Sequence, residues 1–148
     1  QWQAPASSAQ WNYTAFGQWA DGNLPPDITH ELSFSRIPGA PGLFDRWAIN
    51  AGTKLAGEHI ELRRGKRHRL FLRNQSGTVQ SVHLHRPRFE LIDVNGTATG
   101  GIFKDTVVVP PHAYVAIDLT PIDEGACLFQ SQCQQHADLG LRAVFYCV

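Results

Sequence analysis

Two histidines that alternate with an apolar residue are the first feature of this chain that can do chemistry. His83 and His85 end the segment 80–85, which reads Gln-Ser-Val-His-Leu-His. Residues two apart on a strand point to the same face, with Cα atoms roughly 7 Å apart, so both imidazoles would project together. Paired imidazoles are common ligands of copper and zinc. The alternative is two half-exposed histidines that hydrogen-bond to neighbouring groups.

A cysteine and a histidine three residues apart form the second feature. Cys133 and His136 lie in the polar loop 130–136, Gln-Ser-Gln-Cys-Gln-Gln-His, and Leu141 follows it. A thiolate, an imidazole and an apolar residue in the weak axial position are the pattern of a blue-copper loop. The alternative is a loop thiol near a surface histidine.

The three cysteines form the third feature, because they allow at most one internal bridge and leave one thiol over. Cys127 and Cys147 flank the last loop in segments that both resemble strands, so a hairpin would bring them close together. They are a candidate disulfide, which would suit an exported, oxidising compartment and leave Cys133 free. The alternative is two buried free thiols.

Length and charge limit the partners. The chain has 148 residues, enough for one domain with a proper core. Thirteen basic and thirteen acidic residues give zero net charge. This balance argues against nucleic acid or an acidic membrane as a partner, because both select basic proteins. No apolar run approaches the roughly 20 residues that cross a bilayer. Methionine is absent, so no thioether can serve as an axial ligand.

Short strands must position these side chains, because period-two alternation and turn residues recur along the chain. We expect an all-β fold of about eight short strands, a sandwich or barrel with Greek-key connections. Asn95-Gly96 predicts a tight turn, and residues 134–140 predict no more than a turn or two of helix. Residues 1–30 are expected to form an arm or linker, and residues 31–148 the domain. Nine segments have strand character, close to the eight expected: 31–37, 44–49, 59–63, 67–73, 79–84, 89–94, 106–109, 114–119 and 143–148.

Five segments occur in the order and spacing of motifs from one known family. They are 44–50, 65–74, 82–91, 104–111 and 128–148. They are similar to F-x-R-W-x-I-N-G, G-K-R-Y-R-L-x-x-R-N, H-P-V-H-L-H-x-H-x-F-E-L, K-D-T-V-x-V-P-P and L-F-H-C-H-x-x-x-H-x-x-x-G-(F/L/M). From about Trp11 to Val148 the chain therefore resembles the C-terminal cupredoxin domain of a bacterial multicopper oxidase, the laccase-like family.

The resemblance implies a Greek-key cupredoxin sandwich with copper ligands at one end. In the family, the last domain holds a type 1 copper that takes electrons from substrate. It also supplies half of the ligands of a trinuclear copper cluster that reduces dioxygen, and the first domain supplies the other half. Oxygen reduction would therefore need partners, either other cupredoxin domains of a longer chain or a trimer of two-domain chains.

Most of the copper ligands that the resemblance implies are replaced in this sequence. The first type 1 histidine falls on Gln80, the type 1 cysteine on Ser131, and its two flanking histidines on Gln130 and Gln132. Glutamine is a poor copper ligand, and a serine hydroxyl cannot replace a thiolate. The ligand positions that survive are His83 and His85 of the trinuclear site, His136 as the second type 1 histidine, and Leu141 in the axial position.

Three functions remain open on the sequence. The first is a domain of multicopper-oxidase descent with a degenerate copper site, inactive alone, metal-free or with residual copper, and structural or interacting in role. The second is a mononuclear copper electron-transfer module that uses Cys133 and His136 with His83 or His85. The third is the C-terminal domain of a working copper oxidase that other cupredoxin domains complete. All three fit a periplasmic or secreted protein.

Overall fold

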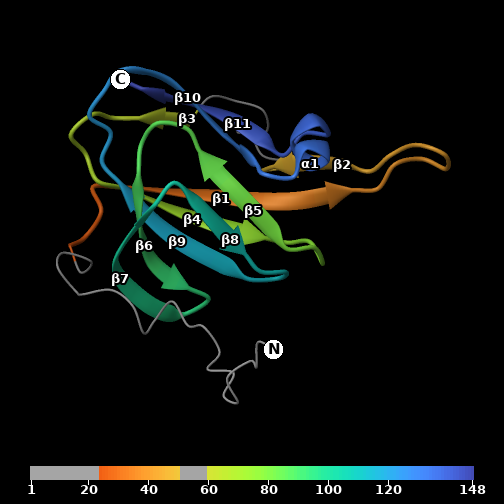
Figure 1. Cartoon of the computed structure of the whole chain (residues 1–148), viewed down its shortest axis with the longest axis horizontal. Helices are drawn as coiled ribbons and strands as arrows, with labels where there is room; N and C mark the ends of the chain where they lie inside the picture. The colour runs from red at the N-terminus through yellow and green to blue at the C-terminus, as the bar shows by residue number, and fades with distance from the viewer. Residues whose placement is uncertain (1–23, 51–59) are drawn as a thin grey trace, which may run out of the picture.

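The strands of the chain form two packed sheets, joined by loops and one short helix (Figure 1). The computed structural model describes residues 24–50 and 60–148. Most of the predicted arm, residues 1–23, and the segment 51–59 lie outside the described residues. The described elements are β1 (Ile28–Ile37), β2 (Arg46–Ile49), β3 (Ile60–Leu62), β4 (His68–Asn74), β5 (Gln80–Leu84), β6 (Phe89–Val94), β7 (Thr97–Lys104), β8 (Thr106–Val109), β9 (Tyr114–Leu119), β10 (Gly125–Ser131), α1 (Gln134–Asp138) and β11 (Arg142–Cys147).

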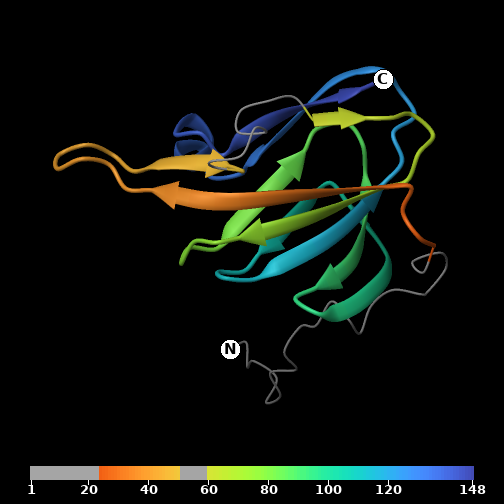
Figure 2. The same cartoon turned by 180° about the vertical axis from the view of Figure 1, so that it is seen from behind.

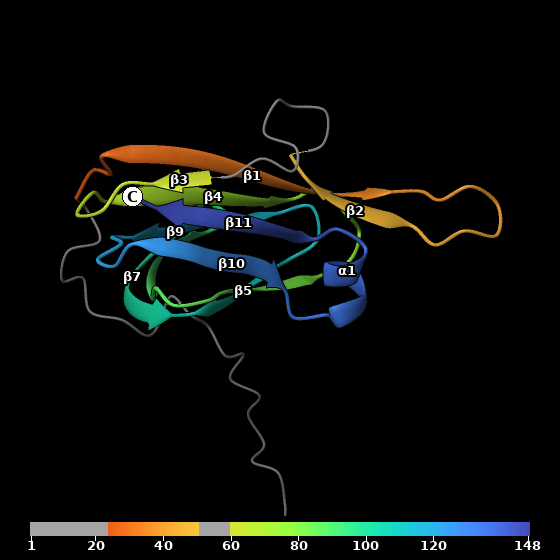
Figure 3. The same ribbon diagram turned by 90° about the horizontal axis from the view of Figure 1, so that it is seen from above.

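One sheet has six strands in the order β2-β1-β4-β9-β6-β7, and the other has five in the order β3-β11-β10-β5-β8. Neighbouring strands are antiparallel except β1/β4 and β11/β3, which are parallel. This is the all-β Greek-key sandwich that the sequence predicts, and Figure 2 shows it from behind. In Figures 1 and 3 the loop between β1 and β2 extends beyond the body at the end that carries α1.

Phenylalanine rings from both sheets fill the space between them. Phe34 of β1, Phe129 of β10 and Phe145 of β11 are at most 1% exposed. The Phe129 ring stacks on Phe145 with centroids 5.4 Å apart and lies 5.9 Å from Phe34 in the other sheet. Burying one such side chain contributes about 2 kcal/mol, because apolar surface leaves water. These contacts fix β10 and β11, the strands on either side of the polar loop with Cys133 and His136.

The described residues contain eleven strands, where the sequence predicts about eight. The main strand missed is β7, because its two glycines, Gly100 and Gly101, weaken the β signal. It forms nevertheless, since it pairs with β6 as a hairpin across the predicted Asn95-Gly96 turn. Both turn residues have positive φ, 51° and 89°, which is the backbone that a type I′ turn requires.

Both ends of the predicted domain can be compared with the structure. β1 begins at Ile28, so its first three residues belong to the segment 1–30 that the sequence assigns to an arm. They are part of the sheet because β1 pairs with β4 from Ile28 opposite His68 onward. At the other end, α1 and β11 lie where the sequence predicts a helical turn and a last strand.

Candidate metal centre

Four residues at positions implied for a type 1 copper converge at the end of the sandwich that carries α1. Gln80 begins β5, Ser131 ends β10, His136 lies in α1, and Leu141 lies between α1 and β11. Backbone bonds hold them together: Ser131 N donates to Leu141 O at 3.0 Å, and Leu141 N donates to His136 O at 2.8 Å. Gln80, Ser131 and Leu141 are at most 2% exposed, and His136 is half-buried. We call these four residues the inner cluster.

A side-chain hydrogen bond joins two members of the inner cluster. His136 Nδ1 lies 3.1 Å from Gln80 Oε1. Because the amide oxygen only accepts, the imidazole proton lies on Nδ1 in this pairing. The other amide atom, Gln80 Nε2, is buried without a hydrogen-bond partner in the part of the chain that the structure describes. An unpaired buried donor costs about 1–3 kcal/mol, so the cluster is not fully satisfied.

The surroundings of His136 favour its neutral form. The Trp47 ring of β2 packs on the imidazole with centroids 4.5 Å apart. Burial lowers the pKa of His136 below its usual 6.5, and the positive charge of Arg36 lowers it further. At neutral pH the ring is therefore uncharged and keeps its hydrogen bond to Gln80.

A glycine lets the loop after α1 pack against β2. Gly140 has a φ of +118°, and a Cβ at this position would clash with the carbonyl oxygen of Trp47. The Trp47 N–H donates to Leu139 O at 2.8 Å, which fixes the loop on the strand. This close approach of two backbones holds His136 against the indole ring.

His83, on the face of β5 opposite to Gln80, lies beside His85, which directly follows the strand. We call these two residues the outer histidine pair. Their ring centroids are 4.5 Å apart in an edge-to-face arrangement. His83 Nδ1 lies 2.9 Å from Thr106 Oγ1 on β8, and His85 Nε2 lies 3.5 Å from Gln130 Nε2. Because His85 is exposed and His83 half-buried, both rings can meet a ligand or a partner domain.

The structure does not bring Cys133 together with the histidines. Cys133 is exposed beside Gln132, and its N–H donates to Ser131 Oγ at 3.1 Å. The outer pair points away from the face of β5 that carries Gln80, the residue that contacts His136. Nowhere in residues 24–50 and 60–148 do three or more His, Cys, Asp or Glu side chains gather as metal ligands. The predicted set of Cys133, His136 and one outer histidine is therefore not assembled.

The candidate disulfide is not formed in this structure, where Cys127 and Cys147 are buried free thiols. Cys127 lies opposite Phe145 and Cys147 opposite Gly125, so the two cysteines are diagonal neighbours. Diagonal neighbours usually have Cα atoms about 7–8 Å apart. A disulfide spans roughly 4.4–6.8 Å between Cα atoms, so this register does not favour the bond. The sequence does place the cysteines close together, since they are diagonal neighbours on paired strands and Cys147 helps to raise the pKa of Cys127.

Two residues that shape the site are not identified by the sequence patterns. Trp47 lies far from His136 along the chain, and only the packing of β2 on α1 brings their rings together. Thr106 lies opposite His83 because β5 pairs with β8. Both residues fall in segments that resemble family motifs, which is the signal that could have indicated them.

The six-stranded and five-stranded sheets form the sandwich of a cupredoxin-like domain. The chain belongs to the multicopper oxidase family, because the family model described as Multicopper oxidase matches residues 29–147. Multicopper oxidase MmcO from Mycobacterium tuberculosis is 27% identical over 116 residues, which cover 78% of this chain and 22% of the relative. The chain thus spans about a fifth of the length of that curated relative.

Solved structures share the fold. A multicopper oxidase from Campylobacter jejuni, described as a metallo-oxidase, matches with a TM-score of 0.73 and 19% identity over 88% of this chain and 32% of its own. Fet3p, a multicopper oxidase that functions in iron import, matches with a TM-score of 0.75 and 14% identity. The match covers 99% of this chain and 36% of Fet3p. Copper nitrite reductase from Nitrosomonas europaea matches with a TM-score of 0.70 and 14% identity. The match covers 86% of this chain and 51% of the reductase. At these identities the likeness concerns the fold alone. No helix within the described ranges has the length and hydropathy to span a membrane.

Proposed function

We propose that this chain is a cupredoxin domain that has given up its type 1 copper and serves as a structural and interaction domain. The observation that carries the proposal is the 3.1 Å hydrogen bond between His136 Nδ1 and Gln80 Oε1. Ser131 is also engaged within the protein, because its Oγ accepts from the N–H of Cys133. Hydrogen bonds within the chain thus occupy positions where the family resemblance implies copper ligands.

The donor set of the inner cluster does not fit a type 1 copper. Such a site needs one thiolate and two imidazoles in a trigonal arrangement. The cluster offers one imidazole, one amide, one hydroxyl and the aliphatic side chain of Leu141. Gln80 and Ser131 are at most 2% exposed, so these two positions are closed to solvent.

A copper titration tests the proposal. We expect Cu(II) to give no intense blue absorption and no type 1 EPR signal in the wild-type chain. The double variant Gln80→His/Ser131→Cys would restore a thiolate and two imidazoles together with His136, and we expect it to turn blue. Each single variant is the matched control, because it lacks one of the three ligands and should stay colourless.

A blue wild-type chain would overturn the proposal. A double variant that is folded by circular dichroism but colourless would also count against it, because the inner cluster would then not be a former type 1 site. Cu(I) bound elsewhere on the chain does not interfere with this test, since it has no EPR signal and no blue colour.

The outer histidine pair supports an interaction role. Thr106 holds His83 in place and His85 is exposed, so a preformed polar patch faces outward. The partners that we propose for this face are other cupredoxin domains, of the same chain or of another. Replacing both histidines by alanine should weaken association but change the free energy of unfolding by no more than about 1 kcal/mol. Sedimentation velocity over a range of concentrations measures the first effect, and denaturant unfolding the second.

A second candidate is the C-terminal domain of a working oxidase whose trinuclear site other domains complete. The observation that favours it is the survival of the outer pair, with ring centroids 4.5 Å apart. Gln130 and Gln132 weigh against it, because they stand at two further ligand positions that the resemblance implies. Oxygen uptake with a reducing phenol, measured on this chain together with the cupredoxin domains that would complete the site, separates the candidates. Uptake that is lost in His83→Ala/His85→Ala favours the oxidase, and no uptake favours the structural domain.

We also propose a periplasmic or secreted location. The proposal rests on the family resemblance alone, because the two buried cysteines are free thiols and give no support of their own. Fractionation of the producing cells, with a cytoplasmic marker enzyme as the control, tests it.

A further inference from the structure

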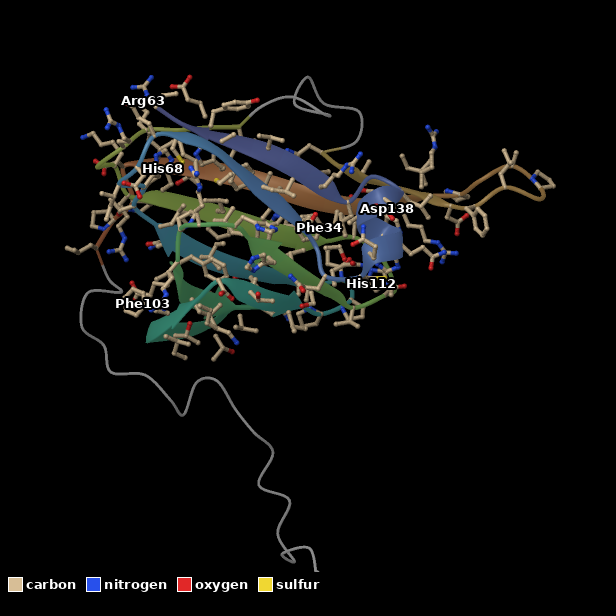
Figure 4. All side chains as sticks on the ribbon, turned by 45° about the horizontal axis from the view of Figure 1, so that its top comes forward. Phe34, Arg63, His68, Phe103, His112 and Asp138 are labelled. Carbon is tan, nitrogen blue, oxygen red and sulfur yellow. The ribbon has the colours of Figure 1, made fainter. Side chains whose placement is uncertain are left out.

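A cleft of about 490 Å³ opens between the two sheets, away from the inner cluster. Figure 4 places Phe103, which lines this cleft, at the opposite end of the molecule from Asp138 of α1. Cys127 and Cys147 also line the cleft, so both sulfur atoms can be approached from it. The proposed function uses neither of these thiols.

The two thiols form a close pair at the wall of the cleft. Cys127 is 4% exposed and Cys147 is 7% exposed, so both are buried yet border a cavity. They are diagonal neighbours on the inward face of β10 and β11, close enough for Cys147 to help raise the pKa of Cys127. Neither sulfur is bonded covalently to a partner.

A guanidinium group supplies positive charge beside the pair. Arg86 lines the same cleft, and its Nη1 lies 3.3 Å from the point where a Cβ on Gly125 would be, opposite Cys147. Burial raises the pKa of the Cys127 thiol to about 12, the neighbouring Cys147 adds to the rise, and the charge of Arg86 opposes it. At neutral pH Cys127 therefore keeps its proton until something displaces it, and Arg86 can balance the negative charge that results.

We propose that Cys127 and Cys147 form a two-coordinate site for a soft monovalent metal ion of the Cu(I) type. Thiolates are soft ligands that select Cu(I), and a monovalent ion with a filled d shell accepts two of them in a linear arrangement. On binding, two S–H bonds are replaced by two S–Cu bonds, both protons leave to solvent, and copper stays Cu(I). The bound unit carries one negative charge, which Arg86 neutralises.

The number of ligands and their register favour this occupant over the alternatives. Structural zinc takes four ligands, and within the described ranges no third His, Cys, Asp or Glu joins the pair. A direct disulfide does not suit the diagonal register of Cys127 and Cys147. A metal ion between the sulfur atoms lengthens the bridge, so the same register can hold it without moving the strands.

Anaerobic titration with Cu(I) against a chromophoric chelator tests the site on the whole chain. We expect one Cu(I) per chain, with two sulfur neighbours in its X-ray absorption spectrum. Cys127→Ala and Cys147→Ala should each weaken binding by about 100-fold or more, because the remaining thiolate is a single ligand. Cys133→Ala is the matched control, since it removes the exposed thiol, and it should bind like the wild type.

Two further measurements keep the test decisive if the alanine variants do not fold. Arg86→Gln leaves both thiols in place and should weaken binding about tenfold without changing the stoichiometry. Because two protons leave on binding, the apparent affinity should rise about 100-fold per pH unit near neutral pH. The other charged residues that line the cleft are Arg67, Arg88, Glu90, Asp118 and Asp123.

Three results would overturn the proposal. One is unchanged Cu(I) binding in a folded Cys127→Ala/Cys147→Ala double variant. Another is a spectrum in which copper has nitrogen neighbours. The last is a thiol titration, in denaturant and without prior reduction, that finds one free thiol where the sequence has three cysteines, because the pair would then be a disulfide.

Discussion

At the scale of single residues, Gln80 and Ser131 keep roughly the volumes of the histidine and cysteine that the family resemblance implies. Size matters here because both side chains are buried, 1% and 2% exposed, and packed interiors tolerate little change in volume. What differs is the chemistry, since the amide oxygen of Gln80 is used and its amide nitrogen is not. The inner cluster is therefore well packed but carries one unsatisfied donor.

Replacing Gln80 by methionine should raise the free energy of unfolding by about 1 kcal/mol. The change removes a buried donor that costs about 1–3 kcal/mol and loses one hydrogen bond worth about 1 kcal/mol. Denaturant unfolding measures the difference. Gln130→Met, at a half-exposed position on the other face, is the control and should change little. A clear loss of stability in Gln80→Met would mean that the amide nitrogen finds a partner in solution.

Gly140→Ala should lower the free energy of unfolding by about 2 kcal/mol or more. A side chain there meets both a positive φ and the Trp47 carbonyl, so the loop must move off β2. The control is Gly77→Ala, where an added Cβ makes only an ordinary contact at 3.7 Å with His112. Thermal unfolding of both variants checks the prediction, and equal stabilities would contradict it.

At the scale of elements, a histidine pair reinforces the parallel ladder between β1 and β4. His30 Nε2 lies 2.9 Å from His68 Nδ1, and the two rings are stacked. His68 is 0% exposed, and its Nε2 lies 2.9 Å from the N–H of Arg63. Burial lowers the pKa of both histidines below 6.5; the positive charge of His68 adds to the effect on His30. At His68, the negative charge of Asp27 opposes the effect of burial and raises the pKa.

This pair predicts a loss of stability in mild acid. The folded-state pKa values lie below 6.5, so the unfolded chain binds more protons once the pH falls below that value. The free energy of unfolding should therefore fall as the pH drops from 6.5 through the folded-state values, by up to about 1.4 kcal/mol per pH unit for each histidine. Denaturant unfolding at a series of pH values measures the slope.

His68→Gln should flatten the slope between neutral and mildly acidic pH, because it removes one of the two titrating groups of the pair. His112→Asn changes an exposed histidine and should leave the slope unchanged. If stability had the same pH slope in the wild type and both variants, the pair would not bind extra protons when the chain unfolds.

The sequence predicts an element well where a local pattern encodes it and poorly where the element depends on tertiary packing. Alternation and turns predict most strands, but the glycines of β7 hide a strand that forms only because β6 offers its partner. The spacing of His83 and His85 predicts their common face, because a period of two is a local property. The contact of Trp47 with His136 depends on tertiary packing, so no local pattern contains it. The distance between Cys127 and Cys147 depends on a register that differs by two residues from direct pairing.

At the scale of the whole molecule, β11 holds the five-stranded sheet together. It lies between β10 and β3, and it buries Phe145 in the space between the sheets. Truncation after Gly140 should therefore leave the chain unfolded, because β3 loses its partner and the core loses a fully buried ring. Circular dichroism and dye binding check this. Removal of the exposed Val148 alone is the control, and a folded truncation would contradict the strand order.

The loop between β1 and β2 has a consequence for how the chain can be cut. It extends beyond the body (Figure 3). Its residues Leu43 and Phe44 are 70% and 76% exposed. A protease that cleaves after large apolar residues can reach both of them. After such a nick β2 remains bonded to β1 along its four residues, with Trp47 still packed on His136. The two fragments should stay assembled, so the domain offers a natural site for splitting it into halves that reassociate.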